Sequence, residues 1–152
     1  MAYEFEIKEL AAQPTACVRE QTTPDVGAVF GRMMGEIFAY LNAHGAQPAS
    51  PPYDRIHAMS DRGFDLEVGI GVAAPIEGDG RVIPGVLPAG RAAVTWHTGP
   101  YDQLSAAHGA MQAWIAEQSL TSAGPGWEVY HTNPNEERDP SKLRTEIVYP
   151  IR

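Results

Sequence analysis

The most informative pattern of hydrophobic and polar positions lies at the end of the chain, in the segment Leu143–Ile151. This pattern predicts a β-strand, and Glu146 lies in its middle. An earlier segment, Phe64–Ile70, has the same character and carries Glu67. A lone carboxylate is costly to bury unless another group pairs with it, so a glutamate in mid-strand is unusual. We infer that the chain builds the same strand twice, around a shared site.

Two segments have the spacing of helices. The first runs from Pro24 to about His44, with apolar residues at Val26, Phe30, Met33, Ile37 and Leu41. Thr23-Pro24-Asp25 would start it with a capping hydroxyl, a proline and an acid, and Gly45 would end it. The second runs from Pro100 to about Ser119 and begins in the same way. Its face holds Leu104, Met111 and Ile115, with Tyr101 and His108 beside them.

The strands around these helices follow one order in both halves. Pro14–Thr22 precedes the first helix, and Gly90–Thr98 precedes the second. After the helices, His57 and His131 are separated by the same number of residues as Tyr53 and Trp127, and the two glutamate strands follow. Extra strands are expected at Glu4–Leu10 and Val82–Leu87.

This order predicts an α+β fold in a single domain, with an internal repeat of about 1–77 and 78–152. Each strand–helix–strand–strand unit would contribute antiparallel sheet covered by one helix, and the halves would be related by a pseudo-two-fold axis. Strand pairs that follow one another without a helix between them argue against a parallel, doubly wound sheet.

Composition narrows the function. The 152 residues carry a net charge of −8 with only 11 scattered basic residues, which argues against nucleic-acid binding and favours cations at a concave site. No apolar run would span a membrane, and no secretion signal is visible, so we expect a cytoplasmic protein. The single cysteine, Cys17, lies in an apolar run and is expected to be a buried, inert thiol.

A family resemblance lies in the last thirty residues. The run Trp127–Pro134, a polar loop and then Thr145–Pro150 resemble the end of the GyrI-like effector-binding domains, as does Thr98–Tyr101. The resemblance implies a duplicated fold that binds bulky, often cationic, aromatic compounds in a central cleft around a glutamate, here Glu146. Such domains occur in multidrug-responsive regulators and as stand-alone proteins, and some resemble hydrolases that open cyclopropane rings of DNA-alkylating natural products. We expect the stand-alone form, with no direct nucleic-acid contact.

Several residues are candidates for the site. Glu146 shares its strand with Ile147 and Tyr149, so if these pack under a helix, Glu146 lies on the open face; the alternative is an exposed edge-strand glutamate. Glu67 is its repeat partner, and Glu128 is a third candidate for the central carboxylate. Aromatic side chains could hold a flat cation by stacking and cation–π contacts. The lining candidates are Trp96, Tyr101, Trp127, Tyr130, Tyr149 and Phe38, although any of them could belong to the core.

Two functions of different class remain open. One is a stand-alone binding protein for lipophilic aromatic cations. The other is a hydrolase in which Glu146 acts as a general base or acid and a tyrosine such as Tyr130 or Tyr149 orients the partner. We expect no cofactor, and the histidines lack the spacing of metal ligands. A third option is a protein that binds a macromolecular partner such as a topoisomerase, although no feature of the sequence supports it.

Overall fold

The computed structural model describes residues 3–23, 26–133 and 136–152. The predicted strand around Glu67 forms β4 (Gly63–Val72), in which alternate residues Leu66, Val68 and Ile70 are buried beneath helix α1 (Val26–His44). The elements group into two units, which we name by their helices. The α1 unit is Ala11–Ala89, and the α2 unit combines Met1–Leu10 with Gly90–Arg152.

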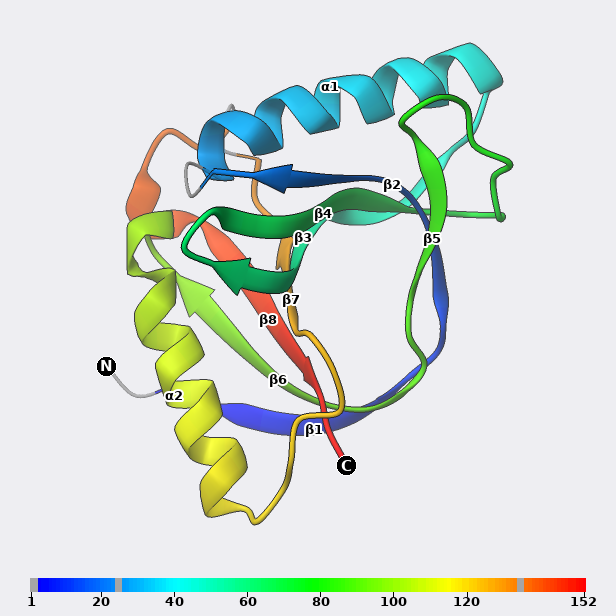
Figure 1. The fold of residues 1–152 in the computed structure, drawn as a ribbon. Coiled ribbons are helices and arrows are strands. Elements are labelled where there is room, and N and C mark those ends of the chain that lie inside the picture. Colours follow the sequence, from blue (N-terminus) through cyan, green and yellow to red (C-terminus); the bar gives the residue numbers. More distant parts are fainter. Residues whose placement is uncertain (1–2, 24–25, 134–135) are drawn as a thin grey trace. The chain divides into compact units, whose positions relative to one another are not determined.

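The α1 unit is a four-stranded antiparallel sheet covered by one helix. Its strands are β2 (Gln13–Thr22), β3 (Pro48–Ser60), β4 and β5 (Ile83–Leu87), in the order β3-β4-β2-β5. Helix α1 contacts β2 and β4, as Figure 1 shows. The helix buries an apolar stripe against these strands, made of Met33, Met34, Ile37, Tyr40 and Leu41. It ends where predicted, because Gly45 follows with a positive φ of 65°.

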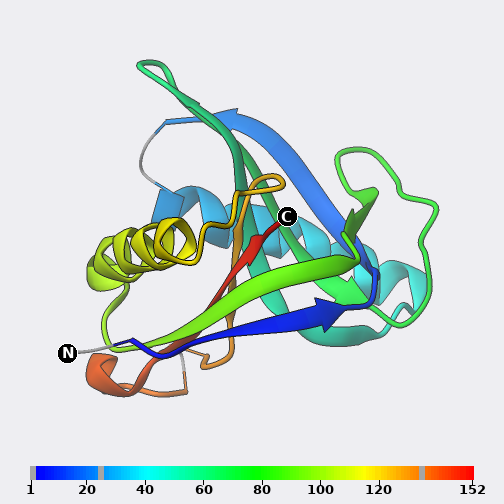
Figure 2. The ribbon, with the colours of Figure 1, turned by 90° about the horizontal axis from the view of Figure 1, so that it is seen from below.

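The α2 unit has the same kind of architecture. Its strands are β1 (Phe5–Leu10), β6 (Gly90–Thr98), β7 (Trp127–Tyr130) and β8 (Arg144–Pro150), in the order β1-β6-β8-β7. Helix α2 (Leu104–Glu117) packs on this sheet, and Figure 2 shows β1 running alongside β6. The apolar contact involves Ala93, Leu104, Ala107, Met111, Ile115, Ile147 and Ile151.

The structure confirms the α+β class with antiparallel sheet and covering helices, and it refines three details. The second helix begins with a short 3₁₀ turn, η1 (Tyr101–Gln103), and another such turn, η2 (Pro140–Lys142), precedes β8. The extra strands pair across the expected halves, because β1 pairs with β6 and β5 pairs with β2. The predicted start of the first helix at Pro24 and Asp25 lies outside the described residues. The pseudo-two-fold axis and the central cleft stay predictions.

No helix among the described residues is both long and apolar enough to cross a membrane.

Candidate ligand-binding site

Glu146 lies on the face of β8 that points away from α2. Ile147 is fully buried in the cluster beneath α2, and Tyr149 packs against the same cluster. Because side chains alternate along a strand, Glu146 is directed to the opposite face, as the sequence predicts. Trp96 on β6 is its direct neighbour across the sheet. Cross-strand neighbours stand about 4.5–5.5 Å apart at Cβ, so an indole lies beside the carboxylate.

Two basic side chains complete this group. The His131 Nε2 atom lies 3.0 Å from Glu146 Oε1, and the His131 ring centroid is 4.7 Å from that of Trp96. The guanidinium carbon of Arg144 lies 4.4 Å from the centre of the Trp96 ring. The Glu146 and His131 side chains keep 18% and 33% of their surface exposed. We call Trp96, His131, Arg144 and Glu146 the Glu146 face, and it combines an anion with an aromatic platform that a ligand can reach.

Glu67 in the α1 unit has a more enclosed environment. It is only 6% exposed on β4. The Tyr53 hydroxyl donates a hydrogen bond to Glu67 Oε2, and His57 Nε2 lies 2.7 Å from Oε1. The Tyr53 hydroxyl also bonds to the Thr15 hydroxyl over 3.1 Å. Both carboxylate oxygens therefore already have partners, which stabilises the buried charge.

The Tyr53 ring and the Glu67 charge also affect the residues around them. A Cβ atom at Gly69 would lie 2.8 Å from the Tyr53 hydroxyl and 2.7 Å from the carbonyl oxygen of Ala16, so only glycine leaves room for the tyrosine ring. Burial, and next the charge of Glu67, raise the pKa of the Cys17 thiol to about 12. The thiol is thus buried and protonated, in agreement with the expected inert cysteine. Burial also lowers the pKa of Arg55, an effect that the nearby Glu67 charge opposes.

Glu128 belongs to a third cluster, on the helix-facing side of the α2 unit. The His108 Nε2 atom lies 2.5 Å from Glu128 Oε1, and the Tyr130 hydroxyl donates to Oε2 over 2.6 Å. His108 Nδ1 lies 2.7 Å from the Tyr149 hydroxyl. Tyr101 packs edge-on against Tyr130, with ring centroids 5.4 Å apart. Burial raises the pKa of both Tyr101 and Tyr149.

The structure therefore divides the predicted site residues. Trp96 and Glu146 share one face, whereas Tyr101, Tyr130 and Tyr149 lie on the other side of the same sheet. Trp127 faces the Glu146 side, since it stands opposite Val148 on β8, but it is 4% exposed and belongs to the core. Phe38 lies on α1 and is 44% exposed, outside that helix's buried stripe.

Sequence reasoning missed several residues of these clusters. Tyr53 and His57 hold Glu67, and His131 holds Glu146. The matching positions of His57 and His131 in the two halves are a signal of a shared role. Arg144 was not identified at all. It precedes Glu146 by two residues on a strand, which places both side chains on one face.

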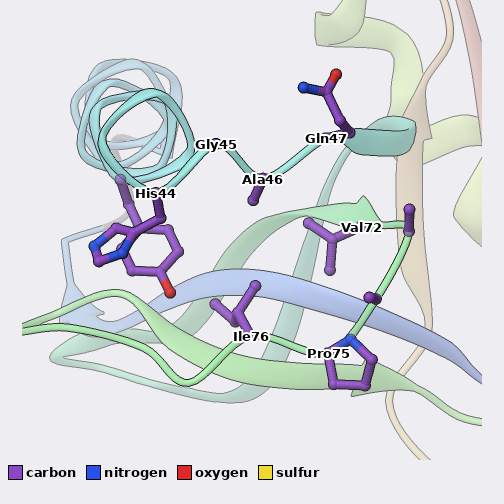
Figure 3. Close-up of a pocket in the computed structure, with 10 residues that line it drawn as sticks. His44, Gly45, Ala46, Gln47, Val72, Pro75 and Ile76 are labelled. Atoms are coloured by element: carbon purple, nitrogen blue, oxygen red, sulfur yellow. The ribbon is translucent and has the colours of Figure 1, made fainter.

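A pocket of about 330 Å³ lies in the α1 unit, and none of the predicted site residues lines it (Figure 3). It is lined by the end of α1 and by the chain after β4: Tyr40, His44, Gly45, Ala46, Gln47 and Val72–Ile76. The His44 ring stacks on Tyr40 at 4.1 Å. Among the described residues no group of three or more histidine, cysteine or acidic side chains could hold a metal ion.

The chain resembles several solved structures. It aligns with the C-terminal domain of EcmrR at 20% identity and a TM-score of 0.87, covering 100% of this chain and 99% of that one. In an EcmrR–DNA complex the match has 22% identity and a TM-score of 0.88, and it covers 99% of this chain but 57% of the EcmrR chain. The chain thus spans little more than half of that relative. At such identities the likeness establishes the fold alone.

Two further structures carry names that bear on function. A hydrolase from Listeria innocua matches at 14% identity with a TM-score of 0.69, covering 98% of this chain and 92% of that one. SAV2435 bound to tetraphenylphosphonium matches at 13% identity with a TM-score of 0.68, covering 98% and 94%. No curated protein matches the chain in sequence. The profile of the GyrI-like small molecule binding domain matches residues 3–152, essentially the whole chain, so the protein belongs to that family.

Proposed function

We propose that this domain binds bulky aromatic cations and that Glu146 supplies the anion that recognises their charge. The observation that carries the proposal is the placement of Glu146 beside Trp96, on the face of β8 that α2 does not cover. A carboxylate attracts a cation, and an indole face attracts the same cation through its quadrupole, with about 0.5–2 kcal/mol per contact. Together they favour ligands that are both aromatic and positively charged.

Glu146 suits this role better than the other two carboxylates. Glu67 is almost fully buried with both oxygens hydrogen-bonded, so a ligand would have to displace Tyr53 or His57. Glu128 likewise has partners on both oxygens. Glu146 keeps part of its side chain exposed, and its partner is the imidazole of His131. Because Glu146 is partly exposed, a cation can approach its carboxylate without displacing a buried side chain.

Two further observations support the choice of a cation. The protein carries a net charge of −8, which raises the local concentration of cations. SAV2435, which shares the fold, was solved with tetraphenylphosphonium, a bulky aromatic cation.

The test compares two ions of nearly equal size and opposite charge. Tetraphenylphosphonium and tetraphenylborate would be titrated against the protein by isothermal calorimetry. The cation should bind with micromolar affinity, about −8 kcal/mol. The anion should bind at least about ten-fold more weakly, because it loses a charged contact of about 1.5–3 kcal/mol. Equal affinities would refute electrostatic recognition.

A hydrolase is the second candidate, and one contact favours it. The Glu146–His131 pair is partly exposed, and a carboxylate joined to an imidazole is a common arrangement for activating water. The Listeria innocua hydrolase has the same fold. In this version His131 replaces Tyr130 as the partner, since Tyr130 bonds to Glu128. Turnover of an electrophilic cyclopropane substrate, absent in Glu146→Gln, would favour the hydrolase.

A further inference from the structure

Arg144 covers the aromatic platform of the Glu146 face. Its guanidinium carbon lies 4.4 Å from the centre of the Trp96 ring, within the range of a cation–π contact. Its backbone is fixed at the start of β8, because its N–H donates to the Thr132 hydroxyl over 3.1 Å and its carbonyl accepts from the His131 N–H over 3.1 Å. The side chain itself is exposed and belongs to a residue type with many rotamers, so it can leave the ring without disturbing the strand.

The contact resembles the one expected for a ligand. A planar, weakly hydrated guanidinium stacks on aromatic rings as a planar aromatic cation would. Trp96 stands directly opposite Glu146 on the neighbouring strand, so a cation over this indole also lies near the carboxylate. Glu146 in turn has the imidazole of His131 at 3.0 Å. In this conformation the protein's own basic side chains occupy the positions that a bound cation would use.

We propose that Arg144 is a specificity-determining residue that competes with the ligand for the face of Trp96. This inference rests on the proposed function. A planar aromatic cation must displace the guanidinium, and its larger ring surface allows it to do so. A small aliphatic cation makes no larger contact with the Trp96 ring than the Arg144 guanidinium already makes. It therefore cannot displace the guanidinium and is excluded. The Arg144 charge also repels any second cation that approaches while the guanidinium remains over the ring.

The consequence is that removing Arg144 strengthens binding, whereas removing an ordinary contact residue weakens it. Arg144→Met keeps a flexible apolar stem and deletes the charge. A cation–π contact at an exposed site corresponds to about a two- to five-fold change in affinity. Arg144→Met should therefore bind a planar cation about two- to five-fold more tightly, and Arg144→Lys should fall between Arg144→Met and the unaltered protein because an ammonium stacks less well than a guanidinium.

The experiment is a fluorescence titration with ethidium, a planar phenanthridinium cation, at fixed ionic strength. The matched control is Arg62→Met, which removes the same charge from an exposed position in the turn between β3 and β4 of the α1 unit. It should leave the affinity unchanged, which separates a local effect from the change in net charge. Tetramethylammonium would serve as a competitor, and its inhibition constant, corrected for the tighter binding of ethidium, should be lower for Arg144→Met than for the unaltered protein.

Glu146→Gln separates the two claims. If Glu146→Gln weakens ethidium binding while Arg144→Met and Arg144→Lys leave it unchanged or weaken it, the proposed function stands and the role of Arg144 is refuted. If Glu146→Gln has no effect, the proposed function itself fails. An equal gain in Arg144→Met and Arg62→Met would reduce the effect of Arg144 to net charge, and this too would overturn the inference.

Discussion

Tyr53→Phe tests how the buried carboxylate of the α1 unit is stabilised. The substitution removes one oxygen atom from a side chain that is 1% exposed and leaves its ring in place. The lost hydroxyl donates to Glu67 and is also bonded to Thr15. A hydrogen bond to a charged group contributes about 1.5–3 kcal/mol, and an acceptor left without its donor in a buried site has little water to replace it.

We therefore expect the variant to lose about 2 kcal/mol of stability, with a Tm lower by about 4–8 °C for a chain of this size. Urea unfolding should be followed by far-ultraviolet circular dichroism, because Trp96, Trp114 and Trp127 all belong to the α2 unit and their fluorescence would report on that unit. Fluorescence recorded in parallel checks that a single transition is being analysed.

A double-mutant cycle with Glu67→Gln provides the control. If the hydroxyl acts through the carboxylate charge, Tyr53→Phe should cost markedly less in the Glu67→Gln background than in the unaltered protein. The reasoning would be refuted by a loss below about 0.5 kcal/mol, which is within the range of ordinary surface substitutions. Equal losses in the two backgrounds would also contradict it, because they would show that the tyrosine contributes through packing alone.

Three further predictions concern the same unit. Cys17 should resist thiol reagents at pH 8 in the folded protein and react fully in denaturant. Burial raises the pKa of the Cys17 thiol to about 12. The stability gained from keeping this thiol protonated in the folded protein is therefore complete below about pH 9 and is lost as the pH rises toward 12, which an alkaline unfolding series would detect. Hydrogen bonds from Arg32, and next from Arg81, lower the pKa of Glu20 to about 2. The stabilisation from these bonds is therefore present above about pH 4.5 and is lost as the pH falls toward 2. Arg81→Ala should raise the pH midpoint of acid unfolding, and an unchanged midpoint would count against a role for this ion pair. Gly63→Ala should destabilise the protein by about 3 kcal/mol or more, since φ is +125° and a Cβ atom would lie 1.8 Å from the Thr22 carbonyl oxygen. The control is Gly31→Ala in α1, where the space around the glycine is open. It should stabilise the protein by about 0.5–1 kcal/mol in the same denaturation assay.

Sequence patterns predicted the elements well where local physics decides them. The segment Gly90–Thr98 forms β6 with the predicted bounds, and helix α1 ends at His44 because Gly45 adopts the left-handed conformation. The first turn of the second helix is different. Pro100 cannot donate a backbone hydrogen bond, and the chain forms a 3₁₀ turn before the α-helix begins at Leu104.

Strand pairing was harder to predict than strand positions. The positions of Glu4–Leu10 and Val82–Leu87 in the order of elements predict that each is a strand, but they carry no information on which neighbour each one joins. The two strands exchange places between the expected halves, β1 with β6 and β5 with β2. Such pairing is set by contacts between residues far apart in the chain, which a periodic pattern does not encode.

The sequence predicted the face on which Glu146 lies, and it predicted the positions of the candidate aromatic residues only partly. The alternation around Glu146 was sufficient to place it opposite the α2 core. The tyrosines could not be assigned in the same way, because Tyr130 donates a hydrogen bond to Glu128 on its own strand and Tyr149 contacts His108 on α2. An aromatic side chain can pack in the core or line a ligand site, and only the fold shows which of the two it does.

The most direct test of the central claim is the affinity of Glu146→Gln for tetraphenylphosphonium, measured by isothermal calorimetry beside the unaltered protein. The substitution keeps the size of the side chain and removes its charge. We predict a loss of about 10- to 150-fold, which corresponds to about 1.5–3 kcal/mol, with no fall in Tm. If the protein were a hydrolase, binding of substrate would persist while turnover fell by about 10²- to 10⁴-fold. Unchanged affinity and unchanged turnover in this one variant would contradict the account, because Glu146 would then be an ordinary strand residue and not the anion of the site.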